Sequence, residues 1–170
     1  QVRRDMMLMG FSSMQRKGYD IKDLVNAIGD LIDTPDGLNV AVVGVGNLGK
    51  AVTGYFRGKR SKLNIVATFD VDSEKVGRVV SGVKCYHIDE IAKVVKKLNI
   101  SIGILTLPPE YAKNTAELLA VNGVRGMLNF TTVPLNMPAN VYLEEFDMIT
   151  SLEKVAYFVK KQEEEKKSFT

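Results

Sequence analysis

Apolar runs and amphipathic stretches alternate through the middle of the chain. Runs typical of buried strands lie at residues 39–43, 65–69, 83–86, 102–107, 126–130 and 141–143. Helical patterns separate several of them, at residues 47–56, 88–98 and 109–121, and the last begins with a proline, which suits the first turn of a helix. Strands that alternate with helices indicate a parallel sheet, because parallel neighbours need a crossover between them. The pattern predicts an α/β fold with a doubly wound parallel sheet over residues 39–150.

Further segments flank this domain. Residues 21–32 place apolar side chains on one helical face, and the Thr-Pro-Asp-Gly sequence at 34–37 predicts a linker. Residues 10–19 hold two glycines and alternating apolar positions, which is consistent with a small hairpin or wing. Residues 151–167 carry an apolar stripe that must pack on another surface. That surface is either the domain's own sheet or a partner subunit, and the residues leave both open.

Composition allows one full core and a small appendage, because 45% of the 170 residues are hydrophobic. None of the apolar runs approaches the roughly 20 residues that cross a bilayer, and no signal-peptide core follows the basic N-terminus. We therefore expect a cytoplasmic chain without a membrane partner. The net charge of +3 lies within the first 17 residues, where Arg3, Arg4, Arg16 and Lys17 outnumber Asp5. Such a basic arm either contacts an anionic partner or is a solvated end.

A glycine-rich sequence, GVGNLG, fills residues 44–49 between the first strand and the first helix of the domain. In a dinucleotide-binding turn Gly44 makes the tight turn, Gly46 lets the backbone approach a pyrophosphate, and Gly49 lets the helix pack closely on the strand. The predicted helix begins at Asn47, followed by Leu48. The N–H groups of a helix N-terminus attract phosphate. The sequence predicts a dinucleotide site, and a glycine-rich turn without a ligand is the alternative.

An acidic residue follows the second strand, in the sequence Asp70-Val71-Asp72. A carboxylate at this place would accept hydrogen bonds from the adenosine ribose hydroxyls and repel a 2′-phosphate, so NAD is favoured over NADP. Lys75 and Arg78 follow a few residues later. They either receive a phosphate or are solvated helix positions.

Polar and aromatic residues follow the fourth and fifth strands, whose ends overhang the nicotinamide in a doubly wound sheet. They are Thr106, Leu107 and Pro108 after the fourth strand and Asn129 and Phe130 after the fifth. Amide, hydroxyl and aromatic groups suit recognition of a carboxamide ring and of its charge, which is positive in NAD⁺ and absent in NADH. The alternative is that these strand ends only turn the chain.

The sequence offers few groups for catalysis. A hydride-transferring enzyme needs an acid or base near the nicotinamide, yet the single histidine, His87, stands where a helix begins and is expected to cap it or lie on the surface. The single cysteine, Cys85, lies in an apolar run and is predicted to be a buried structural thiol. One histidine and one cysteine cannot form a zinc site. We expect no catalytic residue and no metal site.

Two other classes of protein stay open at this point. An NAD-dependent oxidoreductase, or the nucleotide domain of a larger enzyme, would need an activating acid or base that the residues do not offer. A dinucleotide- or coenzyme A-binding subunit of a complex would not form a homodimer alone.

Several motifs taken together resemble those of the Rex redox-sensing transcriptional repressors over nearly the whole chain. They are QVRRD at residues 1–5, Gly18-Tyr19, VGVGNLG at 43–49, FDVD at 69–72, GMLNF at 126–130 and Tyr157-Phe158 in the last helix. The resemblance implies a homodimer with an N-terminal winged-helix domain that binds operator DNA. It also implies a Rossmann domain that binds NADH and NAD⁺, and release from DNA when NADH replaces NAD⁺.

The resemblance implies roles for residues outside the nucleotide site as well. The C-terminal helix would be exchanged between subunits, so that its stripe contacts the partner through Leu152, Val155, Tyr157, Phe158 and Val159. A polar switch would join Tyr55 on the first helix of the domain to Asp147 before the last helix, and to Arg3 or Arg4. The alternative is that Tyr55 belongs to the core and Asp147 caps a loop.

The resemblance divides the chain into four parts. Residues 1–33 would be the remnant of a winged-helix DNA-binding domain, residues 34–38 a linker, residues 39–150 the Rossmann domain, and residues 151–170 the dimerisation helix and tail. The DNA contacts would come from Arg3, Arg4, Arg16 and Lys17. A winged helix needs three helices before its wing, whereas this chain begins within what resembles the end of the recognition helix. We therefore expect it to bind dinucleotide and dimerise, but to bind DNA poorly.

Overall fold

The computed structural model describes residues 21–22, 25, 37–56 and 62–168. Its helices are α3 (Asn47–Phe56), the 3₁₀ helix η1 (Ile88–Glu90), α4 (Ile91–Lys97), α5 (Pro109–Val121) and α6 (Met148–Ser168). Its strands are β1 (Leu38–Val43), β2 (Leu63–Asp70), β3 (Val79–Val80), β4 (Val83–His87), β5 (Ile100–Leu105), β6 (Gly126–Asn129) and β7 (Tyr142–Glu145). The basic arm, and most of the helix predicted at 21–32, lie outside the described residues.

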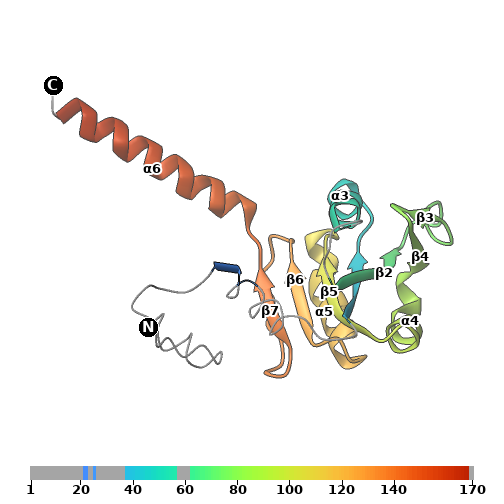
Figure 1. The fold of residues 1–170 in the computed structure, drawn as a ribbon. Coiled ribbons are helices and arrows are strands. Elements are labelled where there is room, and N and C mark those ends of the chain that lie inside the picture. The colour runs from blue at the N-terminus through green and yellow to red at the C-terminus, as the bar shows by residue number, and fades with distance from the viewer. Residues whose placement is uncertain (1–20, 23–24, 26–36, 57–61, 169–170) are drawn as a thin grey trace, which may run out of the picture.

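The strands form one sheet in the order β3-β4-β2-β1-β5-β6-β7, with β1 at the centre (Figure 1). All neighbours pair in parallel except β3 and β4. The chain builds one half outward from β1 through β2 and β4, and then returns to the other side of β1 for β5, β6 and β7. The predicted doubly wound sheet is confirmed. The order in which the chain adds strands reverses between β1 and β5, and such a reversal leaves a crevice at the carboxyl ends of the strands.

Local signals explain where the elements match the sequence pattern and where they differ. Helices α3 and α5 have the predicted bounds. The pattern does not predict β3, whose turn into β4 uses Ser81 and Gly82 with φ of 49° and 82°, because serine is a weaker signal for such a turn than asparagine. The helix predicted at 88–98 divides into η1 and α4, since a capping box between His87 and Glu90 starts a separate 3₁₀ turn. His87 therefore has the capping role predicted for it.

The sheet has a core on each face, because alternate residues of β1 point to opposite sides. Val43 belongs to the core that α4 and α5 cover, whereas Val42 belongs to the core on the other face, with Val52 and Phe56 of α3. Cys85 is fully buried, and burial raises the pKa of its thiol. The prediction of a buried structural cysteine is confirmed.

Helix α6 extends away from the sheet (Figure 1). Its residues from Met148 to Glu164 are all exposed in the single chain, including the five apolar residues predicted to contact a partner. The sequence allowed this stripe to pack either on the domain's own sheet or on a partner subunit, and the first of these alternatives is wrong. Although α6 has 21 residues, neither it nor another helix of the described part is both long and apolar enough to cross a membrane.

The packing of α3 on the glycine-rich turn can be tested at Gly49. A Cβ added there would collide with the Gly44 carbonyl oxygen and lie 2.8 Å from Thr106 Oγ1. Gly49→Ala should lower the free energy of unfolding by about 2 kcal/mol or more, because backbone must shift. Gly54→Ala in the same helix, where a Cβ meets open space, should raise it by about 0.5–1 kcal/mol. Urea unfolding at one protein concentration measures the free energy of unfolding of both variants. Equal changes in the two variants would contradict the close packing assigned to Gly49.

Candidate functional site

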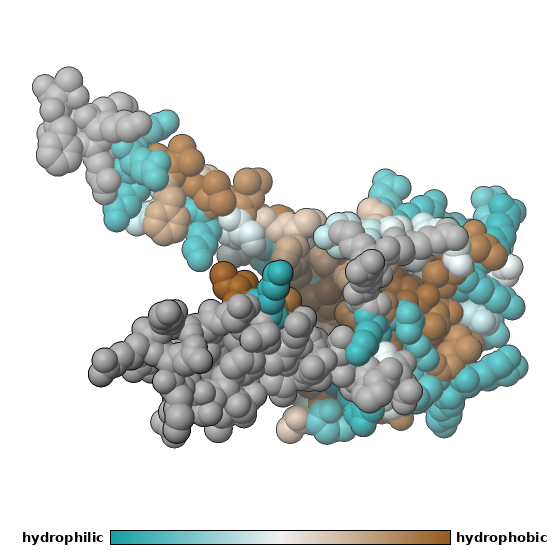
Figure 2. Space-filling view, in the orientation of Figure 1, coloured by the Kyte–Doolittle hydropathy of each residue, from teal (hydrophilic) through white to brown (hydrophobic). Residues whose placement is uncertain are grey.

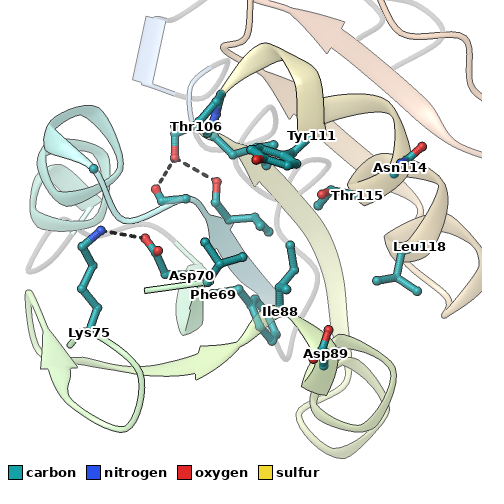
Figure 3. A pocket seen from close by; sticks show the side chains of 16 residues that line it. Phe69, Asp70, Lys75, Ile88, Asp89, Thr106, Tyr111, Asn114, Thr115 and Leu118 are labelled. Carbon is teal, nitrogen blue, oxygen red and sulfur yellow. Dashed lines mark hydrogen bonds and ion pairs between the residues drawn. The ribbon is translucent and has the colours of Figure 1, made fainter. Parts of the chain in front are cut away.

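A cavity of about 590 Å³ opens at the carboxyl ends of β1, β2 and β5, where the strand order reverses (Figure 3). This volume is within the range of small-molecule sites. Eight of the predicted site residues line it: Gly44, Gly46, Asp70, Val71, Lys75, Thr106, Leu107 and Pro108. The fold therefore brings together the glycine-rich turn, the acidic end of β2 and the end of β5.

The glycine-rich turn forms one wall of the cavity. Gly44 has a φ of +94°, and a Cβ on it would lie 2.7 Å from the backbone of Leu107. Its N–H donates to the Phe69 carbonyl at 2.8 Å, and its own carbonyl accepts from Thr106 Oγ1 at 2.7 Å. The turn is thereby attached to both neighbouring strands. A Cβ on Gly46 would meet nothing within 4 Å, which leaves room for a ligand to approach the backbone.

The first turn of α3 follows directly and consists of Asn47, Leu48 and Gly49. The first N–H groups of a helix have no partner within it and carry partial positive charge. This first turn contains no acidic residue, so no negative side chain of the turn would repel an anion bound at the glycine-rich sequence. These residues do not line the cavity with their side chains, and their contribution to a ligand would come from backbone N–H groups.

Asp70 attaches the end of β2 to the glycine-rich turn. Its Oδ2 accepts a hydrogen bond of 2.7 Å from the N–H of Val45, and its Oδ1 accepts one of 2.9 Å from the N–H of Asp72. Lys75 Nζ lies 3.2 Å from Oδ2. Burial of this 9% exposed residue favours the neutral acid, but the three partners outweigh burial and lower the pKa of Asp70 below its ordinary value of 3.8. The cavity wall therefore carries an ionised carboxylate at neutral pH.

Lys75 bridges two carboxylates beside the cavity, and Figure 3 shows its contact with the first of them, Asp70. Its Nζ lies 3.2 Å from Oδ2 of Asp70 and 3.2 Å from Oδ2 of Asp72. Desolvation opposes its charge, but the two carboxylates outweigh desolvation and raise the pKa of Lys75. Residues 73–77 form turns and not the predicted helix, and Lys75 is partly buried whereas Arg78 is exposed. Arg78 is not among the residues that line the cavity.

Sequence reasoning missed much of the cavity's apolar wall. Phe69, Ile88 and Leu118 supply apolar surface. Side chains of η1 and α5 add polar groups, and the missed polar residues are Asp89, Tyr111, Asn114 and Thr115. Residues 111, 115 and 118 are spaced to share one helical face, a signal that the sequence does contain. A mostly apolar wall with few polar groups suits a flat heterocycle.

The end of β6 lies outside the cavity lining. The Asn129 side chain is buried and donates to the Val133 carbonyl at 2.9 Å, while it accepts from the N–H and Oγ1 of Thr131 at 3.0 and 2.7 Å. The Phe130 ring lies 5.1 Å from that of Phe146. In the single chain these residues turn the strand end, which is the alternative that the sequence left open.

The two described residues of the predicted switch are both exposed. Tyr55 is 63% exposed, with its ring edge-on to Phe56, so its assignment to the core is wrong. Asp147 accepts from the N–H of Ile149 at 2.9 Å and from the N–H and Oγ1 of Thr150 at 3.1 and 2.6 Å. The Thr150 side chain contributes most to lowering the pKa of Asp147. Asp147 therefore caps α6. The arginines of the switch lie outside the described residues.

Several titratable groups in and beside the cavity are engaged in contacts with the protein itself. His87 uses Nδ1 to accept from the N–H of Asp89 at 3.3 Å, and it does not line the cavity. Lys75 and Asp70 are bonded to each other. Across the described residues no group of three or more His, Cys, Asp or Glu side chains is placed to hold a metal ion.

The contacts of Asp70 predict a pH-dependent contribution to stability. Because its folded pKa is lowered, the carboxylate stabilises the fold fully above the unfolded value near 3.8, and this contribution is lost as pH falls through the folded value. Asp70→Asn should lower the free energy of unfolding by about 1–3 kcal/mol at about pH 7. The difference from the unchanged chain should shrink below pH 3.8.

Urea unfolding at about pH 7 and about pH 3 measures this difference. Asp89→Asn, at an exposed carboxylate of the same cavity, serves as the control and should change the free energy of unfolding by less than about 0.5 kcal/mol. A difference for Asp70→Asn that stays constant with pH would contradict the assigned contacts.

Known proteins are similar to this chain, some over the domain and some over nearly its whole length. A family model described as a CoA binding domain matches residues 36–133. The redox-sensing transcriptional repressor Rex of Lactobacillus acidophilus is 34% identical over 163 residues, which are 96% of this chain and 77% of that protein. These similarities cover the flanking segments as well as the domain.

Solved structures extend the similarity to the fold. The structure of RSP, a Rex-family repressor, with β-NAD⁺ and operator DNA has a TM-score of 0.86 and 28% identity, over 98% of this chain and 76% of that chain. The structure of RSP with β-NADH has a TM-score of 0.84 and 28% identity, over 98% and 77% of the two chains. These relatives are named as repressors and not as enzymes, which supports the expectation that the chain has no catalytic residue. The chain belongs to the Rex family of redox-sensing transcriptional repressors.

Proposed function

We propose that this chain is a redox-sensing transcriptional repressor of the cytoplasm that binds NADH and NAD⁺ in the described cavity. One observation carries the proposal: an open glycine-rich turn, an ionised carboxylate and an apolar wall line the same cavity, at the point where the strand order reverses. A relative with this fold was solved with β-NAD⁺ and operator DNA, and with β-NADH. The difference between the two ligands would then control binding to operator DNA.

The cavity fits the parts of a dinucleotide. The open space at Gly46 would receive the pyrophosphate, beside the backbone N–H groups at the start of α3. The apolar wall with Ile88 and Leu118 would receive the adenine. We assign the end of β5, which lines the cavity, to the nicotinamide half together with Asn129 and Phe130 at the end of β6. When bound, the dinucleotide supplies a ring that is positively charged in NAD⁺ and uncharged in NADH.

A sensor of this kind works by differential affinity. A ligand shifts a protein between two states only by the ratio of its affinities for them. NADH would bind the state released from DNA more tightly than the state bound to DNA, and by linkage operator DNA would oppose NADH binding. No reaction is needed, which is consistent with the pairing of Asp70 with Lys75 in the cavity.

We place the polar switch at Tyr55 and Asp147, with Arg3 or Arg4. Both described members are exposed, so another subunit or domain can reach them. Asp147 caps α6 through Ile149 and Thr150. A new hydrogen bond to its carboxylate would compete with this cap, and the orientation of α6 would then depend on the state of the switch.

We assign α6 to a homodimer and residues 1–33 to a DNA-binding domain that contacts DNA through the basic arm. Figure 2 shows apolar side chains along α6, on a helix that projects from the rest of the chain. The apolar stripe is between 50% and 69% exposed, and so much apolar surface on one projecting helix is typical of a protein interface. Residues 34–38 would link the DNA-binding domain to the Rossmann domain at 39–150.

The proposal predicts a clear difference between the two redox forms. In calorimetric titrations of this chain at one salt concentration, NADH should bind at least about tenfold more tightly than NAD⁺, because NADH must replace NAD⁺ in the same cavity to change the state of the dimer. Gly46→Val, which fills the open space beside the turn, should abolish binding of both, whereas Gly54→Ala should bind like the unchanged chain. Equal affinities for NADH and NAD⁺, or tighter binding of coenzyme A, would overturn the redox-sensor proposal.

The dimer can be tested on α6. Val155→Asp places a charge in the apolar stripe, where desolvation would cost more than the contact returns, so the dimer dissociation constant should rise by about 30-fold or more. Lys154→Ala, on the same helix outside the stripe, should leave it within about threefold. Analytical ultracentrifugation over a concentration series measures both. A Val155→Asp chain that dimerises as tightly as the unchanged chain would contradict the assignment.

A further inference from the structure

We infer that Thr115 and Asp89 select the base that enters the cavity, and that they favour adenine over hypoxanthine. Hypoxanthine carries a carbonyl oxygen where adenine carries an amino group. The inference deepens the proposed function, on which it rests, because it names the groups that contact the base. Both residues line the cavity, Thr115 on α5 and Asp89 on η1 (Figure 3).

Thr115 is buried, yet its hydroxyl has no partner in the described part of the chain. The residue is 4% exposed, and its side chain makes no hydrogen bond to another described residue. The other buried threonines of that part, Thr53 and Thr68, both donate to a backbone carbonyl. A buried hydroxyl without a protein partner loses the hydrogen bonds that it makes in water. A ligand with polar atoms can restore them.

The open side of this hydroxyl is the cavity. Every fully enclosed side-chain nitrogen or oxygen of the described residues has a partner, so the unpartnered Thr115 oxygen is not fully enclosed. Thr115 lines the cavity, and so does Leu118, which follows one helical turn later on the same face of α5. The proposed function places the adenine against Leu118. The Thr115 hydroxyl is therefore available to the edge of the base.

Asp89 contributes a group that only accepts. Its side chain is 85% exposed, and its Oδ2 lies 3.1 Å from Nδ1 of His87. That nitrogen accepts from the Asp89 N–H at 3.3 Å, so it has no hydrogen to donate to the carboxylate. An ionised carboxylate accepts hydrogen bonds and donates none. Asp89 can therefore accept from an amino group, and it would repel a carbonyl oxygen in the same place.

The two residues together match adenine. Its amino group donates, which suits Asp89, and the neighbouring ring nitrogen accepts, which suits the Thr115 hydroxyl. In hypoxanthine both atoms have the opposite character, because the oxygen accepts and the ring nitrogen carries a hydrogen. A site that hydrogen-bonds its ligand rejects an analogue that leaves those groups unpaired. The apolar wall alone would accept either base.

The test is calorimetric titration with NADH and with the reduced nicotinamide hypoxanthine dinucleotide, which differ only in the base. The unchanged chain should bind NADH about tenfold or more tightly than the hypoxanthine dinucleotide. Thr115→Val keeps the shape of the side chain and removes the hydroxyl. It should weaken NADH by about fivefold or more and the hypoxanthine dinucleotide by less than about twofold, because a base that Asp89 repels does not reach the hydroxyl. Thr115→Ser should bind like the unchanged chain.

Asp89→Asn tests the acceptor. The amide can donate to a carbonyl oxygen, so this variant should strengthen the hypoxanthine dinucleotide and narrow the preference by about fivefold or more. Glu117→Gln removes an equal charge from an exposed position of α5 outside the cavity lining, and should change the preference by less than about twofold. Thr68→Val removes a buried hydroxyl outside the lining and should leave both affinities within about twofold.

Thermal unfolding without ligand separates recognition from folding. Thr115→Val should leave Tm unchanged or raise it, because the lost hydroxyl leaves no protein partner unpaired. A fall in Tm together with an equal loss of affinity for both dinucleotides would show that Thr115 supports the fold and does not contact the base.

The remaining outcomes separate this inference from the proposed function. If the unchanged chain binds NADH and the hypoxanthine dinucleotide equally tightly, the inference is wrong and the proposed function stands. If Asp89→Asn leaves the preference unchanged, the role given to Asp89 is wrong. If the unchanged chain binds neither dinucleotide, the proposed function fails and the inference fails with it.

Discussion

The hydrogen bond from the Val45 N–H to the Asp70 carboxylate is the interaction on which the site depends. Val45 stands between Gly44 and Gly46, so this 2.7 Å contact fixes both glycines relative to the end of β2. Val45 is fully buried, and an N–H left there without an acceptor would cost about 1–3 kcal/mol. Further bonds tie Gly44 to Phe69 and Thr106. The turn is thus held before any ligand arrives.

The two ends of the site are built differently. The cavity, on the side of β2 and α5, is enclosed by elements of one chain and contains buried Asp70. The end of β6 and the start of α6 are open, with Phe146 and Ile149 exposed. In the proposed function the first end supplies affinity for the dinucleotide, which both redox forms share. The second end would respond to the charge of the nicotinamide, because only there can a second subunit complete the surroundings.

Particular elements show how far the sequence could be interpreted. The bounds of α3 and α5 were predictable, because glycines precede one helix and a proline opens the other. Strand β3 was not predictable, because it is two residues long and its turn uses a serine with positive φ. The eight predicted residues that line the cavity belong to the glycine-rich sequence or follow a predicted strand, whereas Ile88 and Asn114 carry no motif. They line the cavity only because the fold brings η1 and α5 to it.

The sequence by itself determined most of the succession of strands and helices, the place of the glycine-rich turn and the acidic residues after β2, because these depend on local periodicity and on backbone freedom at glycine. Only the tertiary structure decided how those acidic residues differ. Asp70 is bonded to Val45, which is 25 positions away in the chain, and Asp72 is left to hold Lys75. No local pattern encodes that difference, because it arises where β1 and β2 lie side by side in the sheet.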